Sequence, residues 1–235
     1  VPGSVVDIEN NLFLNTIKPM KVSAMSGGQH VDINIRHNSF ILNWPFNPDA
    51  TSSNVGVLEL YHSDGYRTLT IEGNLFAYNP GGAMQHDWPA NRMGEIAIRD
   101  NLFHSNGSLF STSTAEEGVI VGKFGTNPTY MSLDLITIED DLDYDVSGNV
   151  SMDPGISLAM APLQAVDNDQ IQRENTLIND VRRILGMNQS GGAVPIANYA
   201  PRMVYFEGLP VFPTSPDAAE YGVQPTRLWS AGRGN

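Results

Sequence analysis

The chain has no cysteine and few basic residues. The absence of cysteine among its 235 residues excludes disulfide bonds and thiolate metal sites and leaves the compartment open. Lysine and arginine number 13 against 26 aspartates and glutamates, which gives a formal net charge of −13. Nucleic acids and anionic membrane surfaces bind basic protein faces, so we expect neither as a partner.

Long apolar runs are also missing. No stretch approaches the roughly 20 apolar residues that a membrane-spanning helix needs, and no secretory signal sequence is visible. Membrane insertion is therefore not expected. The hydrophobic content of 41%, together with 22 glycines and 15 prolines, is typical of a folded, turn-rich β protein.

Four segments share one frame, in which apolar residues alternate along a strand and are followed by Asn and, in most copies, by Leu-Phe. They are residues 6–13, 33–40, 69–76 and 96–103. A fifth segment, residues 136–143, keeps the strand half but lacks the Asn and the Phe. The anchor isoleucines stand at positions 8, 35, 71, 98 and 138, so the intervals are 27, 36, 27 and 40 residues. Repeats of this size predict stacked units that share one core.

The frame predicts one coil of a solenoid. The alternating half is a strand, and the Asn stands where the chain turns, which suits its tolerance of left-handed dihedral angles. Equivalent residues of successive coils would lie about 4.8 Å apart and form an aliphatic column, an asparagine ladder and a phenylalanine stack. The residue after each anchor alternates in charge, which favours stacking in sequence order: Glu9, Arg36, Glu72, Arg99 and Glu139.

The motif I-x-x-N-x-F resembles the repeats of right-handed parallel β-helix proteins, over about residues 4–155. That group includes pectate lyases, other polysaccharide lyases, polygalacturonase-type hydrolases and many surface proteins. Residues 148–156 look like the closing coil of such proteins. The resemblance implies an all-β fold with a right-handed parallel β-helix (solenoid) over residues 1–160. The motif is specific for the fold and not for an activity.

Residues 161–235 form the second expected unit, a C-terminal helix followed by an extended tail. Between Asp167 and Leu185 apolar residues recur at spacings of three, four and seven, which predicts an amphipathic helix. The tail carries many prolines and too many apolar residues for a free linker. We expect it to dock on the solenoid or on a partner.

The first repeat begins at Val6, and no capping element precedes it. The end of a solenoid exposes its core and open strand edges. We therefore expect an upstream segment of a longer solenoid, another chain or another copy to cover the first coil. Alternatively, residues 1–5 lie across that end.

Two loops carry the residues that could do chemistry. If they lie side by side, eight residues form one polar and aromatic patch: His62, Asp64, Tyr66, Arg67, His86, Asp87, Trp88 and Arg92. Such a mixture suits a sugar, and we assign substrate contact to His62, Asp64, Tyr66, Asp87 and Trp88.

Two reactions fit this patch. A uronate lyase needs a cation and a base, which Arg67, His86 and Arg92 could supply together with Lys123. A glycoside hydrolase needs two carboxylic acids, for which Asp64 and Asp87 are available. The alternative is that the His-Asp-Trp loop only closes on itself.

The acidic run at residues 139–145 is a candidate Ca²⁺ site, with Asp140, Asp141, Asp143 and Asp145 as ligands. It lacks the spacing of a calcium-binding loop, so a solvated edge that discourages strand addition is the alternative.

Taken together, the sequence predicts an extracytoplasmic domain, whether extracellular, on the cell surface or periplasmic. We expect it to contact a polysaccharide or other glycan, as part of a polysaccharide lyase or hydrolase. The alternative is a non-catalytic surface or assembly protein that uses the solenoid as a rigid scaffold and the tail for docking.

Overall fold

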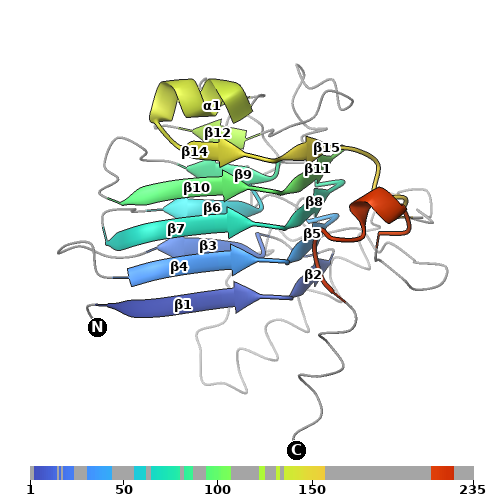
Figure 1. Cartoon of the computed structure of the whole chain (residues 1–235), viewed down its shortest axis with the longest axis horizontal. Coiled ribbons are helices and arrows are strands. Elements are labelled where there is room, and N and C mark those ends of the chain that lie inside the picture. Colours follow the sequence, from blue (N-terminus) through green and yellow to red (C-terminus); the bar gives the residue numbers. More distant parts are fainter. Residues whose placement is uncertain are drawn as a thin grey trace, which may run out of the picture.

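A computed structural model describes residues 3–14, 16, 18–23, 31–43, 56–61, 65–79, 82–86, 94–106, 122–124, 131–132, 135–156 and 213–224. These residues fold almost entirely into strands that form three sheets (Figure 1). The first sheet contains, in spatial order, β1 (Ser4–Glu9), β4 (Val31–Arg36), β7 (Tyr66–Glu72), β10 (Glu95–Arg99) and β14 (Asp145–Ser147). The second contains β2 (Leu12–Leu14), β5 (Ser39–Ile41), β8 (Leu75–Ala77), β11 (Leu102–His104) and β15 (Val150–Ser151). The third contains β3 (Met20–Ser23), β6 (Leu58–Tyr61), β9 (Met84–His86), β12 (Gly122–Phe124) and β13 (Met131–Ser132).

Successive strands visit the three sheets in turn, so β1, β2 and β3 make one coil and β4, β5 and β6 the next. All pairs between coils are parallel, and β12 with β13 is the antiparallel pair among the described strands. Ile35 is the register partner of both Ile8 and Ile71, as the repeat predicted. The all-β prediction is confirmed, and the arrangement is compatible with a parallel β-helix-like solenoid. The helix predicted between residues 167 and 185 lies outside the described part.

The fifth coil does not begin where the repeat predicted. Residues 136–143 lie in and just after helix α1 (Leu135–Leu142), in which Ile138 and Leu142 stand four residues apart and pack against the core. Helical spacing of these apolar residues outweighs the alternation in the sequence. The fifth strand of the first sheet is β14, whose Val146 is the register partner of Ile98.

The interior of the coils contains the predicted aliphatic column and aromatic stack. The rings of Phe13, Phe40, Phe76 and Phe103 form one file, with successive centroids 4.8, 4.8 and 5.2 Å apart and ring planes within 13° of parallel. Phe40, Phe76 and Phe103 are fully buried. The file supports the solenoid prediction most directly, because it exists only if the coils stack in register.

An asparagine ladder runs along the corner between the first and second sheets. From the second rung onward the Oδ1 atom accepts the backbone N–H and the Nδ2–H of the asparagine one coil earlier, as Asn74 does from Asn38 at 2.9 and 3.1 Å. The Nδ2 group donates to backbone carbonyls, in the case of Asn74 those of Ile35 and Glu72. The same contacts join Asn11, Asn38, Asn74, Asn101 and Asn149.

The left-handed residue at this corner is not the asparagine itself, as the sequence suggested, but the residue before it. Asn10, His37, Gly73, Asp100 and Gly148 have φ values between 49° and 65°. The asparagine is free to keep an ordinary backbone conformation because its side chain, rather than its dihedral angles, holds the corner.

A second ladder, which sequence reasoning missed, follows the corner between the second and third sheets. It consists of Asn43, Asn79 and Asn106, and Thr16 takes the asparagine's place in the first coil. The Nδ2 groups of the three asparagines donate to the carbonyls of the stacked phenylalanines. The two ladders therefore hold the strands of the second sheet at both of their ends.

Residues 213–224, the C-terminal strap, cross the outer face of the second sheet. The strap contains a short 3-10 helix (Pro216–Ala218), and its Ala218 and Tyr221 pack against outward-facing residues such as Leu75 and Leu102. Hydrogen bonds tie it to coils far apart, from Thr214 N–H on the carbonyl of Pro154 to the Gln224 N–H on Asn10 Oδ1. This part of the tail packs on the second sheet. The apolar tail residues from which docking was predicted lie outside the described part.

Candidate functional site

The predicted sugar patch is described only in part. Tyr66, Arg67 and His86 lie in the described residues, and five others lie outside them: His62, Asp64, Asp87, Trp88 and Arg92. The structure does not bring the three described members into one exposed patch. Arg67 is exposed, whereas Tyr66 and His86 are buried in the interior.

Arg67, at the start of β7, is engaged across a rung of the first sheet. Its guanidinium donates to the Asp32 carboxylate on β4 from both Nε and Nη2, with a distance of 2.8 Å for the Nε contact. The Thr68 hydroxyl donates to the same carboxylate at 2.9 Å. These bonds, the Arg67 contact foremost, lower the pKa of Asp32, and the carboxylate in turn raises the pKa of Arg67. An arginine held in this way is a poor base at neutral pH.

His86, at the end of β9, faces the interior rather than solvent. Its Nδ1 lies at hydrogen-bond distance from the Tyr144 hydroxyl, and the two ring centroids are 6.0 Å apart. Both side chains are buried. A polymer cannot reach this ring without opening the corner of the coil.

The acidic run also separates. Asp140 lies exposed on α1, Asp143 lies exposed just after it, and Asp145 lies on β14, where its carboxylate accepts from Arg99. Of the Asp141 side chain nothing is described. Among the described ranges no group of three or more His, Asp or Glu side chains could hold a metal ion. Calcium at this run stays a prediction.

A pocket of about 290 Å³ adjoins the run and is lined by Gly94, Glu95, Ile96, Asp143, Tyr144 and Asp145. It sits between the first residues of β10 and β14, close to the buried His86 and Tyr144 pair. Its polar lining is acidic.

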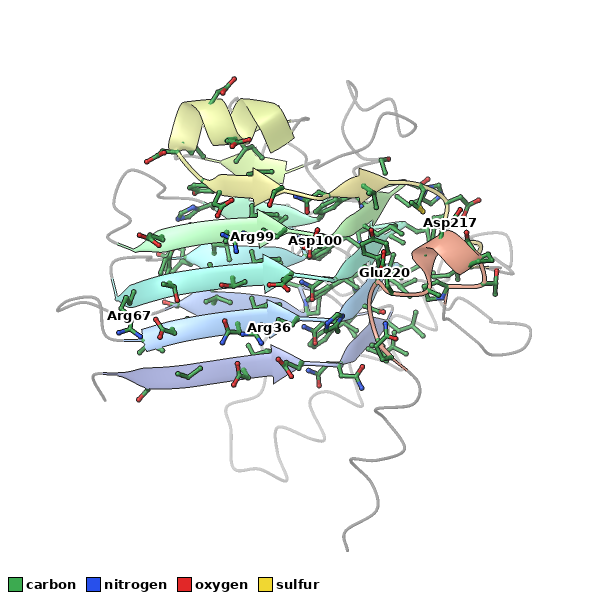
Figure 2. All side chains as sticks on the ribbon, in the orientation of Figure 1. Arg36, Arg67, Arg99, Asp100, Asp217 and Glu220 are labelled. Atoms are coloured by element: carbon green, nitrogen blue, oxygen red, sulfur yellow. The ribbon has the colours of Figure 1, made fainter. Side chains whose placement is uncertain are left out.

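The outer face of the first sheet carries charged side chains on all five of its strands. Figure 2 shows Arg36, Arg67 and Arg99 along this sheet, on successive strands β4, β7 and β10. Arg36 pairs with Glu9 at 3.3 Å, so the first step of the predicted charge ladder is confirmed. Arg99 pairs with Asp145 of the fifth coil, not with Glu139, because residue 139 belongs to α1. The hydrogen bond that Arg99 donates to the Asp145 carboxylate is the main reason that the pKa of Arg99 is raised, with a smaller part from Glu72.

Acidic side chains outnumber basic ones on this face. Its carboxylates are Asp7, Glu9, Asp32, Glu72, Glu95 and Asp145, set against the three arginines. Each described arginine already contacts a carboxylate on a neighbouring strand. The face therefore has a network of polar groups but no spare positive charge for an anionic polymer.

Comparison with protein-family models, with curated proteins and with solved structures found no match. No helix in the described part is both long enough and apolar enough to cross a membrane.

Proposed function

We propose that this chain is a non-catalytic, extracytoplasmic scaffold domain, built as a right-handed parallel β-helix whose coils hold a flat face and a docked tail in fixed positions. One observation carries the proposal: the described side chains best suited to catalysis are engaged in contacts that stabilise the stack. The handedness and the compartment rest on the resemblance of the repeat to β-helix proteins.

The two described catalytic candidates illustrate this. The Arg67 guanidinium donates to the Asp32 carboxylate one coil away. His86 Nδ1 lies at hydrogen-bond distance from the Tyr144 hydroxyl in the interior. A general base must lie within hydrogen-bond reach of a substrate proton. Neither residue meets that condition while these contacts hold.

Rigidity is the second support. Buried asparagines with filled hydrogen-bonding capacity specify one arrangement of the backbone, since any slip would leave polar groups unpaired. Two such ladders and the phenylalanine file run through consecutive coils. The outer faces are thereby held at fixed spacing, as an assembly element requires.

The test uses the full chain with uronate polymers, read by the absorbance of the unsaturated product with and without Ca²⁺, and with neutral glycans, read by reducing ends. We expect no product from the wild type, His86→Ala or Arg67→Ala. His86→Ala should instead lower the urea midpoint of unfolding, whereas Arg67→Ala should change it little because its ion pair is exposed. Turnover by the wild type would overturn the proposal, and its loss in either variant would assign it to that residue.

A second candidate function is glycan contact through the outer face of the first sheet, assisted by calcium at residues 139–145. It is favoured by the exposed row of guanidinium, carboxylate, amide and hydroxyl groups on neighbouring strands, including Asn34 and Thr70. Because carboxylates predominate there, we expect uncharged sugars rather than uronates. A glycan that binds the wild type should bind Asn34→Ala/Thr70→Ala more weakly and Glu220→Ala, on the strap, equally well. Equal binding to all three proteins would refute this candidate.

A further inference from the structure

The first coil presents three open strand edges on one end of the stack. β1, β2 and β3 are the terminal strands of the first, second and third sheets, and each pairs on one side only with the second coil (Figure 1). No described strand lies on their other side. Such edges are templates for adding a strand.

Core side chains are exposed at the same end. Val6 is 43% exposed, although its register partner Ile33 in the second coil is 6% exposed. Phe13 is only partly buried, whereas Phe40 above it is fully buried. The apolar column and the ring file therefore end at a surface that water reaches.

The asparagine ladder is also incomplete here. In the later coils Oδ1 accepts two N–H groups from the asparagine one coil earlier. Asn11 donates from Nδ2 to Glu9 O and Asn38 Oδ1, but no described group donates to its Oδ1. That oxygen is an acceptor at the position where a preceding rung would supply donors.

The negative charge of β1 favours a partner strand that carries a basic residue. Glu9 alternates with Arg36, and Glu72 with Arg99, in one column of outward side chains. Asp7, the neighbouring outward residue, is also acidic. A strand placed beside β1 gains attraction if it carries a basic residue next to Glu9.

We propose that this end of the solenoid binds a parallel strand-turn-strand segment of a partner chain, with Lys or Arg beside Glu9, Asn beneath Asn11 and an aromatic ring beneath Phe13. The proposal rests on the scaffold function and names the partner chemistry for it. A second copy fits less well. Two first coils would bring their acidic strands together, and the opposite end is overlaid by α1 (Figure 1).

The chain itself supplies the probe. A fluorescein-labelled peptide of residues 94–106 contains Arg99, Asn101 and Phe103 in the required frame. The matched control peptide differs only by Arg99→Glu. Anisotropy titrations use the full-length wild type and Glu9→Arg, whose fold is checked by circular dichroism; Glu9 is surface-exposed, so we expect it to tolerate the change.

Wild type should bind the arginine peptide about threefold to tenfold more tightly than the glutamate peptide, and Glu9→Arg should reverse this preference. An Asn101→Ala peptide should bind wild type more weakly than the parent. Absence of binding, or binding indifferent to both charge changes, would overturn the proposal. So would a dimer in light scattering that dissociates on Glu9→Arg, because a second copy would then occupy the edge. These results are independent of the glycan assays. Turnover of a glycan would refute the scaffold function but would not change the peptide titrations.

Discussion

Replacing Asn74 by alanine should be among the most damaging single changes in this chain. Asn74 is fully buried in the middle of the first ladder. Its Oδ1 accepts two hydrogen bonds from Asn38, and its two Nδ2 hydrogens are shared among three acceptors, Ile35 O, Glu72 O and Asn101 Oδ1. This amounts to four full hydrogen bonds, and at a net value of about 1 kcal/mol each their loss costs on the order of 4 kcal/mol. The partner groups left unpaired in the interior add to that cost.

Asn11→Ala is the matched control, since it removes the same side chain from the open end of the same ladder. There the side chain makes only two hydrogen bonds, to Glu9 O and Asn38 Oδ1, in a solvated setting. We expect a loss of about 1 kcal/mol or less. Urea unfolding followed by far-UV circular dichroism and by intrinsic fluorescence compares the variants with wild type. Equal losses for the two variants, or less than about 2 kcal/mol for Asn74→Ala, would refute the account of the ladder.

Three further predictions concern the stack, the strap and a surface ion pair. Phe40→Ala removes a ring stacked on both sides and should cost about 3–5 kcal/mol in the same unfolding assay; a change below about 1 kcal/mol would count against a shared core. Gly222 has φ +71°, and a Cβ there would lie 2.4 Å from Ser39 Oγ, so Gly222→Ala should loosen the strap and speed hydrogen exchange there but not in β7; unchanged exchange would speak against docking. Arg67 lowers the pKa of Asp32, so a carboxyl NMR titration should place Asp32 below the ordinary value of about 3.9, and Arg67→Gln should return it. Because the folded pKa is lowered, the stabilisation from this pair is complete above the unfolded pKa and is lost as pH falls through the folded value; an Asp32 titration midpoint that Arg67→Gln leaves unchanged would contradict the pairing.

The features that could be predicted from sequence are those that repeat. Ile35, Asn38 and Phe40 occupy the same environments as their counterparts one coil away, so one pattern recurs and its spacing reveals the stack. The second ladder carried an equally clear signal. Asn43, Asn79 and Asn106 each stand five residues after an asparagine of the first ladder.

Other features left no periodic signal. The strap meets Ser39 across an interval of 184 residues, and nothing local to either segment announces that contact. The pairs Leu75-Phe76 and Leu102-Phe103 did indicate that the outer face of the second sheet is covered. Two adjacent apolar residues in a strand point to opposite faces, so both faces must be buried. The start of the fifth coil was obscured because β14 contributes a single apolar residue, Val146.

The candidate site depended on the direction in which each side chain points. Strand parity places Arg67 outward and His86, two residues after the core residue Met84 on β9, inward, so two residues that looked equivalent in the sequence lie on opposite faces of their strands. The acidic run was divided in the same way, between α1 and β14.

In-register stacking of the coils can be tested most directly with engineered disulfides, because the chain has no cysteine of its own. Thr70 and Ala97 are register partners on β7 and β10. Their Cα atoms should lie about 5 Å apart, within the range that a disulfide spans. Asn34 lies one coil further along the same column, so the Asn34→Cys/Ala97→Cys pair spans about 10 Å. Mass spectrometry after mild oxidation should find an intramolecular disulfide in Thr70→Cys/Ala97→Cys and none in the control pair. The reverse pattern, or equal cross-linking of both pairs, would contradict the stacked architecture.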